Sequence, residues 1–295
     1  MSIRIVSGRL GPQDLGPPRL ARLQSFLAVS FAPVLLLASP HIAVAADLPM
    51  KASSAPVYNW TGCYIGANLG GAASGTDFTS SVGSGTHFAA DGSVDLVSTA
   101  GTGSANDSSY IVGGQTGCNW QTGTLVLGFE GDFSYFHSHP GFDNNTALTG
   151  NTLVDGSPFE VRQVLTTDYL ATVRPRIGVA ADRSLAYITA GAAFTHANYQ
   201  QTYSDLPNGM GSTISLAPGA GSVSVSKSLV GWVAGAGWEY AWSDHWTFKL
   251  EYLFASFPTT SGFGAITDAT PASNALHGSA NLTIQTARAG VNFKF

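Results

Sequence analysis

The feature that most constrains this chain is a strict two-residue alternation that recurs in eight segments of about ten residues. Within each segment every second side chain is apolar, and the side chains between them are glycine, small polar or charged. This period is typical of a β-strand with one apolar and one polar face. The segments are 61–70, 110–120, 124–135, 168–180, 184–194, 229–241, 245–254 and 282–295.

The connections between these segments are short and long in turn. Residues 121–123, 181–183 and 243–245 form short turns, whereas the four other connections have roughly 25–40 residues rich in Gly, Ser, Thr and Asn. Such long loops are unusual in a compact soluble domain. Three short turns and four long loops are what an eight-stranded outer-membrane barrel requires. We therefore predict an all-β fold, an eight-stranded antiparallel up-and-down transmembrane β-barrel with its short turns in the periplasm.

Composition favours the same fold. Charged residues make up only 11% of the chain, against roughly 25% in ordinary soluble domains. The net charge of −5 gives no basic surface for nucleic acid. Past residue 38 no apolar run approaches the roughly 18 residues of a membrane helix. A soluble β-sandwich is the competing interpretation, but it does not explain the pattern of the connections.

The N-terminus indicates export. Four arginines precede the apolar stretch 26–38, and the small-x-small sequence 43–45 follows it. This order is typical of a secretory signal peptide. We expect a cleavable signal peptide at 1–45, cut after Ala45 or, alternatively, after Ala46. A short periplasmic linker at 46–59 and the barrel at 60–295 would follow, and the protein would reside in the bacterial outer membrane.

The two faces of the segments predict which side contacts lipid. An eight-stranded barrel has an interior just wide enough to be filled by side chains. Glycine and small polar residues fit there, so we expect the bulky aromatic residues to point outward. The charged residues of the segments then face the interior: Glu130, Asp132, Arg174, Arg176, Glu239, Lys249, Glu251 and Arg288. Since buried charges must be paired, we interpret this balanced set as an ion-pair network that plugs the barrel. The functional alternatives are a catalytic carboxylate pair and an ion pathway.

Aromatic residues near the segment ends predict the two membrane interfaces. At the periplasmic rim we expect Trp120, Trp238, Tyr240, Trp246, Phe293 and Phe295. At the outer rim we expect Tyr135, Trp232, Tyr252 and Phe254.

Five stretches of this sequence resemble the outer-membrane immunogenic proteins of alphaproteobacteria, a porin-like family of small barrels of the OmpA membrane-domain type. They are NWTGCYIGANLGG (59–71), GGQTGCNWQ (113–121), LGFEGDF (127–133), RPRIGVA (174–180) and ARAGVNFKF (287–295). The resemblance covers all eight segments. It implies surface-exposed antigenic loops, and a last strand (Val291, Phe293, Phe295) that the barrel-assembly machinery recognises. Implied partners are outer-membrane lipid, that machinery and periplasmic chaperones, with no cofactor.

Three residues depart from the family pattern. Cys63 and Cys118 stand where aromatic residues are usual, on the outward face of adjacent antiparallel strands near the periplasmic end. A cross-strand disulfide and two free lipid-facing thiols are both compatible with the sequence. Pro175 stands where glycine is usual, and because it lacks an N–H we expect a bulge or a local irregularity there.

Three functional classes follow from these observations. We favour a structural and surface-exposed role for a plugged barrel that is not an enzyme. The alternative is a narrow porin-like channel for small solutes. The third is an outer-leaflet lipid hydrolase, or a haem or metal binder, that uses the expected loop His137-Ser138-His139, where a histidine would activate a serine.

Overall fold

The computed structural model describes residues 58–88, 91–145, 153, 158–205, 219–268 and 273–295. These residues belong to one compact unit, Ser54–Phe295. The predicted signal peptide with Ala45 and Ala46, and the linker up to residue 57, lie outside them. The elements are β1 (Gly62–Gly85), α1 (Asp91–Ala100), β2 (Gly103–Thr122), β3 (Leu125–Ser138), β4 (Gly141–Asn145), β5 (Phe159–Ala181), β6 (Ser184–Asp205), β7 (Ala220–Ala241), β8 (Trp246–Thr267) and β9 (Ser273–Lys294).

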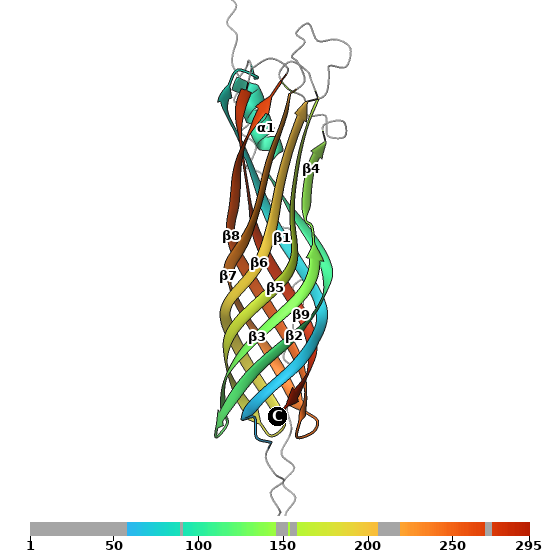
Figure 1. The fold of residues 1–295 in the computed structure, drawn as a ribbon, viewed down its shortest axis with the longest axis vertical. Helices are drawn as coiled ribbons and strands as arrows, with labels where there is room; N and C mark the ends of the chain where they lie inside the picture. The colour runs from blue at the N-terminus through green and yellow to red at the C-terminus, as the bar shows by residue number, and fades with distance from the viewer. Residues whose placement is uncertain (1–57, 89–90, 146–152, 154–157, 206–218, 269–272) are drawn as a thin grey trace, which may run out of the picture. The chain divides into compact units, whose positions relative to one another are not determined.

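Eight of these strands close into a ring (Figure 1). Each pairs antiparallel with its neighbours, the last strand β9 pairs with the first strand β1, and β3 pairs with β5. The short strand β4 is not part of the ring, because it pairs with β5 beyond the end of β3. Closure leaves no unpaired strand edge in the membrane-spanning part, as hydrocarbon requires. The predicted eight-stranded antiparallel barrel is confirmed.

The strands are longer than the sequence predicted. Apart from β3 and β4 they have 20 to 24 residues, about twice the 9–11 residues that cross a membrane. The excess lies on the side of the expected loops, so the prediction of long loops there was wrong. Much of each Ser- and Thr-rich connection is strand that continues past the membrane, which the length of the ribbons shows in Figure 1.

The short turns lie where the two-residue alternation of the sequence ends. Two residues connect β2 to β3 and β5 to β6. In these turns Gly123 has φ 62° and Asp182 has φ 50°, the left-handed conformation that two-residue hairpins of right-twisted strands need. The barrel register is continuous through Pro175, which faces Phe129 on β3. Of the two outcomes expected at Pro175, the structure shows the local irregularity and no bulge. The irregularity consists of missing pairing with β6 at Arg174 and Pro175. The residues on either side of them in β5 pair with β6 in the same register.

The interior changes in character along the barrel. Near the short turns, buried Trp60 packs in an apolar cluster with Val126 and Leu185. Above it lies a layer of buried charged residues. Beyond that layer, the outer half of the interior is an apolar core that includes Phe78, Phe136 and Leu165. The interior is thus filled by three successive layers.

Helix α1 belongs to the outer layer. Val97 of α1 is fully buried in the apolar core. The Ser98 hydroxyl accepts a hydrogen bond of 3.0 Å from the backbone N–H of Val82 on β1. The Gln163 side chain of β5 donates to the carbonyl of Gly101, just after the helix. These contacts place the helix against the inside of the outer strands. No helix in the described part of the chain is long and apolar enough to cross a membrane.

Candidate functional site

The candidate site is the charged layer of the interior. Strand alternation points its members inward from β3, β5, β7, β8 and β9, and all of them are buried. The structure brings together all eight residues that the sequence predicted: Glu130, Asp132, Arg174, Arg176, Glu239, Lys249, Glu251 and Arg288. Four carboxylates face four cations, so the layer carries no net formal charge.

Glu130 and Arg174 form the centre of the layer. Arg174 Nη2 lies 2.7 Å from Glu130 Oε1 and 2.8 Å from Asp132 Oδ2. Lys249 Nζ donates to the same Glu130 oxygen at 2.5 Å. Each cation therefore contacts charges from other strands, and the layer ties the walls of the barrel together across its axis.

Arg288 on the last strand bridges two carboxylates. Its Nη1 and Nη2 donate to Asp132 at 2.9 and 3.0 Å. Its Nε and Nη2 donate to Glu251 at 2.8 and 2.6 Å. Paired contacts of this kind fix geometry as well as charge. Arg288 thus connects β9 to β3 and β8.

Arg176 lies between two tyrosine rings inside the barrel. Its guanidinium carbon is 5.0 Å from the ring centre of Tyr64 and 4.9 Å from that of Tyr187. Its Nη1 is 2.5 Å from Glu239. The Tyr64 hydroxyl donates to Glu130 at 2.6 Å, and the Tyr187 hydroxyl donates to Glu251 at 2.9 Å.

The expectation that aromatic residues would not fit inside was therefore wrong for these two tyrosines. The reason is the glycines opposite them. A Cβ atom at Gly117 would overlap the hydroxyl end of Tyr64, and one at Gly237 would overlap that of Tyr187. The space beside these two interior glycines is thus filled by tyrosine side chains, so the glycines do not mark open space.

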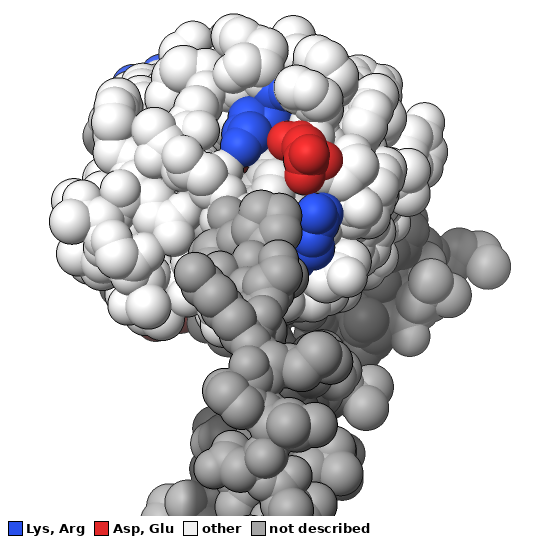
Figure 2. Space-filling view, turned by 90° about the horizontal axis from the view of Figure 1, so that it is seen from below, with Lys and Arg blue, Asp and Glu red and all other residues white. Residues whose placement is uncertain are grey.

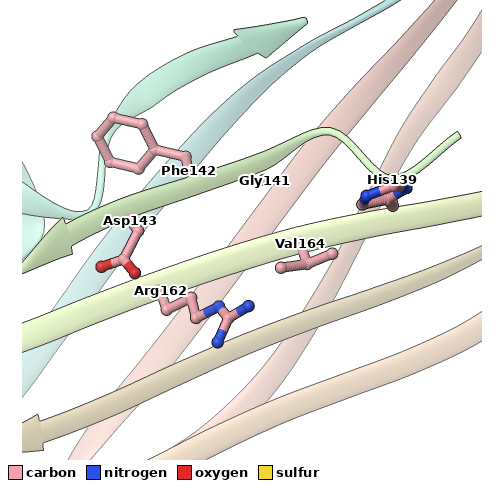
Figure 3. A pocket seen from close by; sticks show the side chains of 6 residues that line it. All are labelled: His139, Gly141, Phe142, Asp143, Arg162 and Val164. Carbon is pink, nitrogen blue, oxygen red and sulfur yellow. The ribbon is translucent and has the colours of Figure 1, made fainter. Parts of the chain in front are cut away.

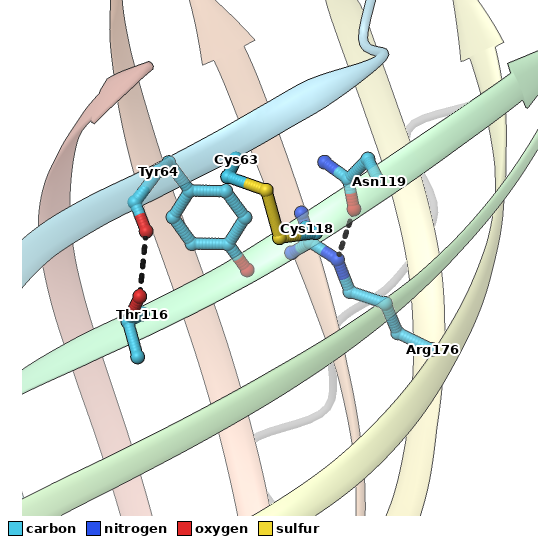
Figure 4. The surroundings of a disulfide bond; sticks show 6 residues. All are labelled: Cys63, Tyr64, Thr116, Cys118, Asn119 and Arg176. Carbon is cyan, nitrogen blue, oxygen red and sulfur yellow. Dashed lines mark hydrogen bonds between the residues drawn. A yellow bond between two sulfur atoms is a disulfide. The ribbon is translucent and has the colours of Figure 1, made fainter. Parts of the chain in front are cut away.

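The two cysteines lie on the outward face of β1 and β2 (Figure 4). Cys63 and Cys118 are directly opposite in the register, and their sulfur atoms are bonded. Their Cα atoms are 4.0 Å apart. On the inner face beside them, Arg176 Nε donates to Asn119 Oδ1 at 2.9 Å. On the outward face, the Thr116 hydroxyl donates to the Tyr64 carbonyl at 3.0 Å. The disulfide is thus on the lipid side of a wall whose inner side carries the charged layer.

The aromatic residues predicted for the rims all point outward. At the end with the short turns, exposed rings include Trp120, Trp238, Tyr240, Trp246, Phe293 and Phe295. Trp242, which the sequence analysis did not assign, joins them and stacks on Trp246 with ring centres 6.3 Å apart. At the opposite level the outward rings are Tyr135, Trp232, Tyr252 and Phe254. Figure 2 views the end with the short turns, and few charged residues appear on the part of the surface that it shows.

The last strand closes the barrel. Phe293 pairs with Ile65 of β1 and with Trp246 of β8, and Val291 pairs with Ala67 and Phe248. The backbone N–H of Phe295 donates to the carbonyl of Cys63 at 3.0 Å. The C-terminal residue is therefore held by the first strand.

The structure does not bring His137 and Ser138 together. Both residues end strand β3 and do not form a loop, so they point to opposite faces. The Ser138 hydroxyl is buried and hydrogen-bonded to Ser74, whereas the exposed His137 ring lies 2.6 Å from Asp168. A serine nucleophile activated by His137 is not assembled.

A shallow pocket of about 220 Å³ lies beside His139, where β3 ends and β4 begins (Figure 3). Phe142, Asp143, Arg162 and Val164 complete its lining with Gly141. Its open position on the outer strands gives it no connection to the charged layer. Among the described residues no group of three or more His, Cys, Asp or Glu side chains is arranged to hold a metal ion.

A closed antiparallel barrel with outward aromatic rims and a charged interior is the architecture of a bacterial outer-membrane β-barrel. Residues 32–295 match the family model described as the outer membrane protein beta-barrel domain, and the chain belongs to this family. It is a protein of the bacterial outer membrane.

Named relatives agree with this assignment. The 31 kDa outer-membrane immunogenic protein of Brucella melitensis is 31% identical over 266 residues, which cover 86% of this chain and 93% of that protein. The 25 kDa outer-membrane immunogenic protein of Brucella abortus is 26% identical, with 80% and 81% covered. The chain is thus homologous to outer-membrane antigens whose names state no enzymatic activity.

Similar solved structures include the outer membrane protein OprG from Pseudomonas aeruginosa, with a TM-score of 0.40, 12% identity, and coverage of 81% of this chain and 99% of that one. The outer membrane protease OmpT from Escherichia coli has a TM-score of 0.33, 10% identity, and coverage of 82% and 99%.

Proposed function

We propose that this protein is a closed outer-membrane barrel with a structural role, which displays its outer strands and their connections at the cell surface. The observation that carries the proposal is the charged layer, in which every carboxylate is paired with a cation at 2.5–2.9 Å. Apolar clusters fill the interior on both sides of it. A pathway for ions would have to break this pairing.

The homology to immunogenic proteins supports the surface role. The strands project beyond the membrane, so their Ser- and Thr-rich outer walls and connections form the part of the protein that faces the exterior. The C-terminal strand supports a further element of the proposal. Its outward Val291, Phe293 and Phe295 form the apolar face that the barrel-assembly machinery would recognise before insertion.

A narrow channel for small solutes is the second candidate. It is favoured by interior polar atoms without a hydrogen-bond partner among the described residues, namely Arg174 Nε, Arg176 Nη2 and the Thr247 and Thr286 hydroxyls. Water molecules would satisfy these atoms, and connected water would conduct. The hydrolase hypothesis has no such support, because its serine and histidine lie on opposite faces of β3.

Single-channel conductance in a planar bilayer separates the two candidates. The refolded chain is first verified as a barrel by its heat-dependent shift on a gel. We expect no conductance steps from the folded chain. The variant Arg288→Ala with Glu251→Ala removes one pair without changing net charge, and we expect it to introduce steps. Arg183→Ala, at an exposed turn, is the matched control and should remain silent. Reproducible steps from the unmodified chain that change in Glu130→Gln would establish the channel instead.

A further inference from the structure

Two exposed histidines lie side by side at the outer end of β3. The ring centres of His137 and His139 are 5.3 Å apart, with an angle of 35° between the ring planes. Their side chains are 51% and 65% exposed. Both lie beyond Tyr135 of the outer aromatic rim, so they face the external medium and not lipid. Neither the barrel fold nor the charged layer requires imidazole at these positions.

Each ring has a carboxylate near its Nδ1 atom. His137 Nδ1 lies 2.6 Å from Asp168 Oδ1 of β5, and His139 Nδ1 lies 3.8 Å from Asp107 Oδ2 of β2. The 3.8 Å separation at His139 is too long for a hydrogen bond. The Asp168 carboxylate accepts from Nδ1 of His137, which fixes the tautomer of that ring and leaves its Nε2 with a lone pair. A hydrogen bond from the other ring nitrogen to a carboxylate is typical of histidines that bind metal ions. Among the described residues, Nε2 of neither ring has a hydrogen-bond partner.

The backbone also holds the pair in place. The pairing of β3 with β5 shifts register between Tyr135 and Ser138, the interval that contains His137, as at a β-bulge or a similar irregularity. Bulges redirect side chains and occur frequently beside functional sites. The backbone N–H of His139 donates to Asp107 at 2.9 Å.

We propose that His137 and His139 form a surface site for a divalent transition-metal ion, bound through the two Nε2 atoms. Imidazole ligands suit copper, nickel and zinc, and affinity is expected to be highest for Cu²⁺. Exposed side chains can rotate the short distance that a shared ion requires. Because the described residues offer no third ligand, water would complete the coordination, and the ion would exchange with the external medium.

Another histidine provides a matched control. His196 is also exposed on the outer wall, but its Nε2 and Nδ1 atoms lie 2.9 and 3.3 Å from the hydroxyls of Ser226 and Ser228. It has no second imidazole among its ring contacts. Metal binding that depends on the pair should therefore be unchanged in a His196→Ala variant.

The test is a Cu²⁺ titration of the full chain, refolded in detergent without a histidine tag and followed by calorimetry and by the electron paramagnetic resonance of the bound ion. We expect one saturable site with nitrogen ligands. His137→Ala with His139→Ala should abolish it, and Asp168→Asn should weaken it by about tenfold. His196→Ala should bind as the unmodified chain does, and Mg²⁺ should not compete.

Heat-dependent gel migration verifies the fold of every variant, and surface substitutions should leave it intact. Equal Cu²⁺ affinity in the double variant would overturn the proposal. So would a spectrum from the folded, unmodified chain without nitrogen coupling. Both results are independent of conductance, so the site and the closed-barrel proposal can fail separately.

Discussion

The membrane-spanning half and the outer half of this barrel are built with opposite polarity. In the membrane, apolar side chains such as Leu250 point outward and charged residues such as Glu251 point inward. In the outer half, Leu165 and Tyr199 point inward, whereas Gln200 and Thr202 point outward. The same strands run through both halves with the same two-residue period. The comparison shows that solvent, and not topology, decides which face of a strand is apolar.

The largest effect should come from breaking the charged layer. Arg288→Met leaves Asp132 and Glu251 buried with fewer partners, and removing one member of a buried pair costs about 3–5 kcal/mol. The free energy of unfolding in lipid vesicles, from urea titration, measures this loss. Arg183→Met is the control, because Arg183 pairs with Asp244 at an exposed turn, 3.4 Å away. A small loss for Arg288→Met would show that the layer tolerates unpaired charge.

The stability of the outer half should depend on the packing of its apolar core and not on buried charge. Leu165 is fully buried in the apolar core, and Leu165→Ala should cost about 3 kcal/mol. Leu250→Ala, on the lipid-facing wall, leaves no enclosed cavity and should cost less. Hydrogen exchange should show faster exchange in the outer strands for Leu165→Ala while the membrane-spanning amides stay protected. Loss of protection throughout would mean that the two halves unfold as one unit.

One strand provides a direct test of where the polarity changes. Ala190 and Thr202 both point outward from β6. Ala190→Arg places a cation in hydrocarbon and should cost about 2–4 kcal/mol, whereas Thr202→Arg should cost at most about 1 kcal/mol. Unfolding in vesicles of the two variants gives the difference. Equal costs would place both residues on the same side of the lipid boundary.

The smallest expected effect concerns the outer end, where buried His87 lies 3.0 Å from Asp205 and 3.0 Å from Asp268. Burial raises the pKa of Asp205 despite hydrogen bonds from Gly219 and His87. The folded state therefore holds this proton more tightly than the unfolded state. The stabilisation is fully present below about pH 4, the ordinary value of an aspartate, and is lost as pH rises through the raised pKa.

Hydrogen exchange near His87 should thus become slower on acidification, beyond the intrinsic pH effect on exchange. Asp205→Asn should remove this dependence. Asp95→Asn, on α1, is the comparison variant. A pH dependence that persists in Asp205→Asn would assign the proton to another group.

The sequence was sufficient for the ring of strands and for the members of the charged layer. Both depend on the two-residue alternation of the membrane-spanning segments. There the lipid-facing side chains are apolar and the interior ones are polar, charged or glycine, so the two faces are easily distinguished. The outer half was missed because its alternation uses Ser, Thr and Gly on the outward face, a composition that is also typical of loops. Here Phe78 points inward between Asp77 and Thr79, and Val82 points inward between Ser81 and Gly83. This reversal of faces has no strong signature in the sequence.

Two details of the interior depend on contacts between strands that are distant in sequence. Tyr64 fits inside because Gly117 on the next strand leaves space, and Tyr187 fits because of Gly237. Trp60 precedes the first alternating segment, so nothing in its own neighbourhood predicted that it packs against Val126 and Leu185. The two-residue period predicts on which face of a strand a side chain lies, but not how much space the neighbouring strands leave for it.

The disulfide has a consequence for the order of biogenesis. Cys63 and Cys118 point toward lipid in the finished barrel, and thiol–disulfide exchange needs access for an attacking thiolate. A charged thiolate does not enter hydrocarbon, so we expect the bond to exchange less readily with soluble thiols after insertion. Its formation therefore belongs to the periplasmic passage of the chain, when β1 and β2 first meet. We therefore expect the redox state of these two sulfurs to be set before the barrel is inserted.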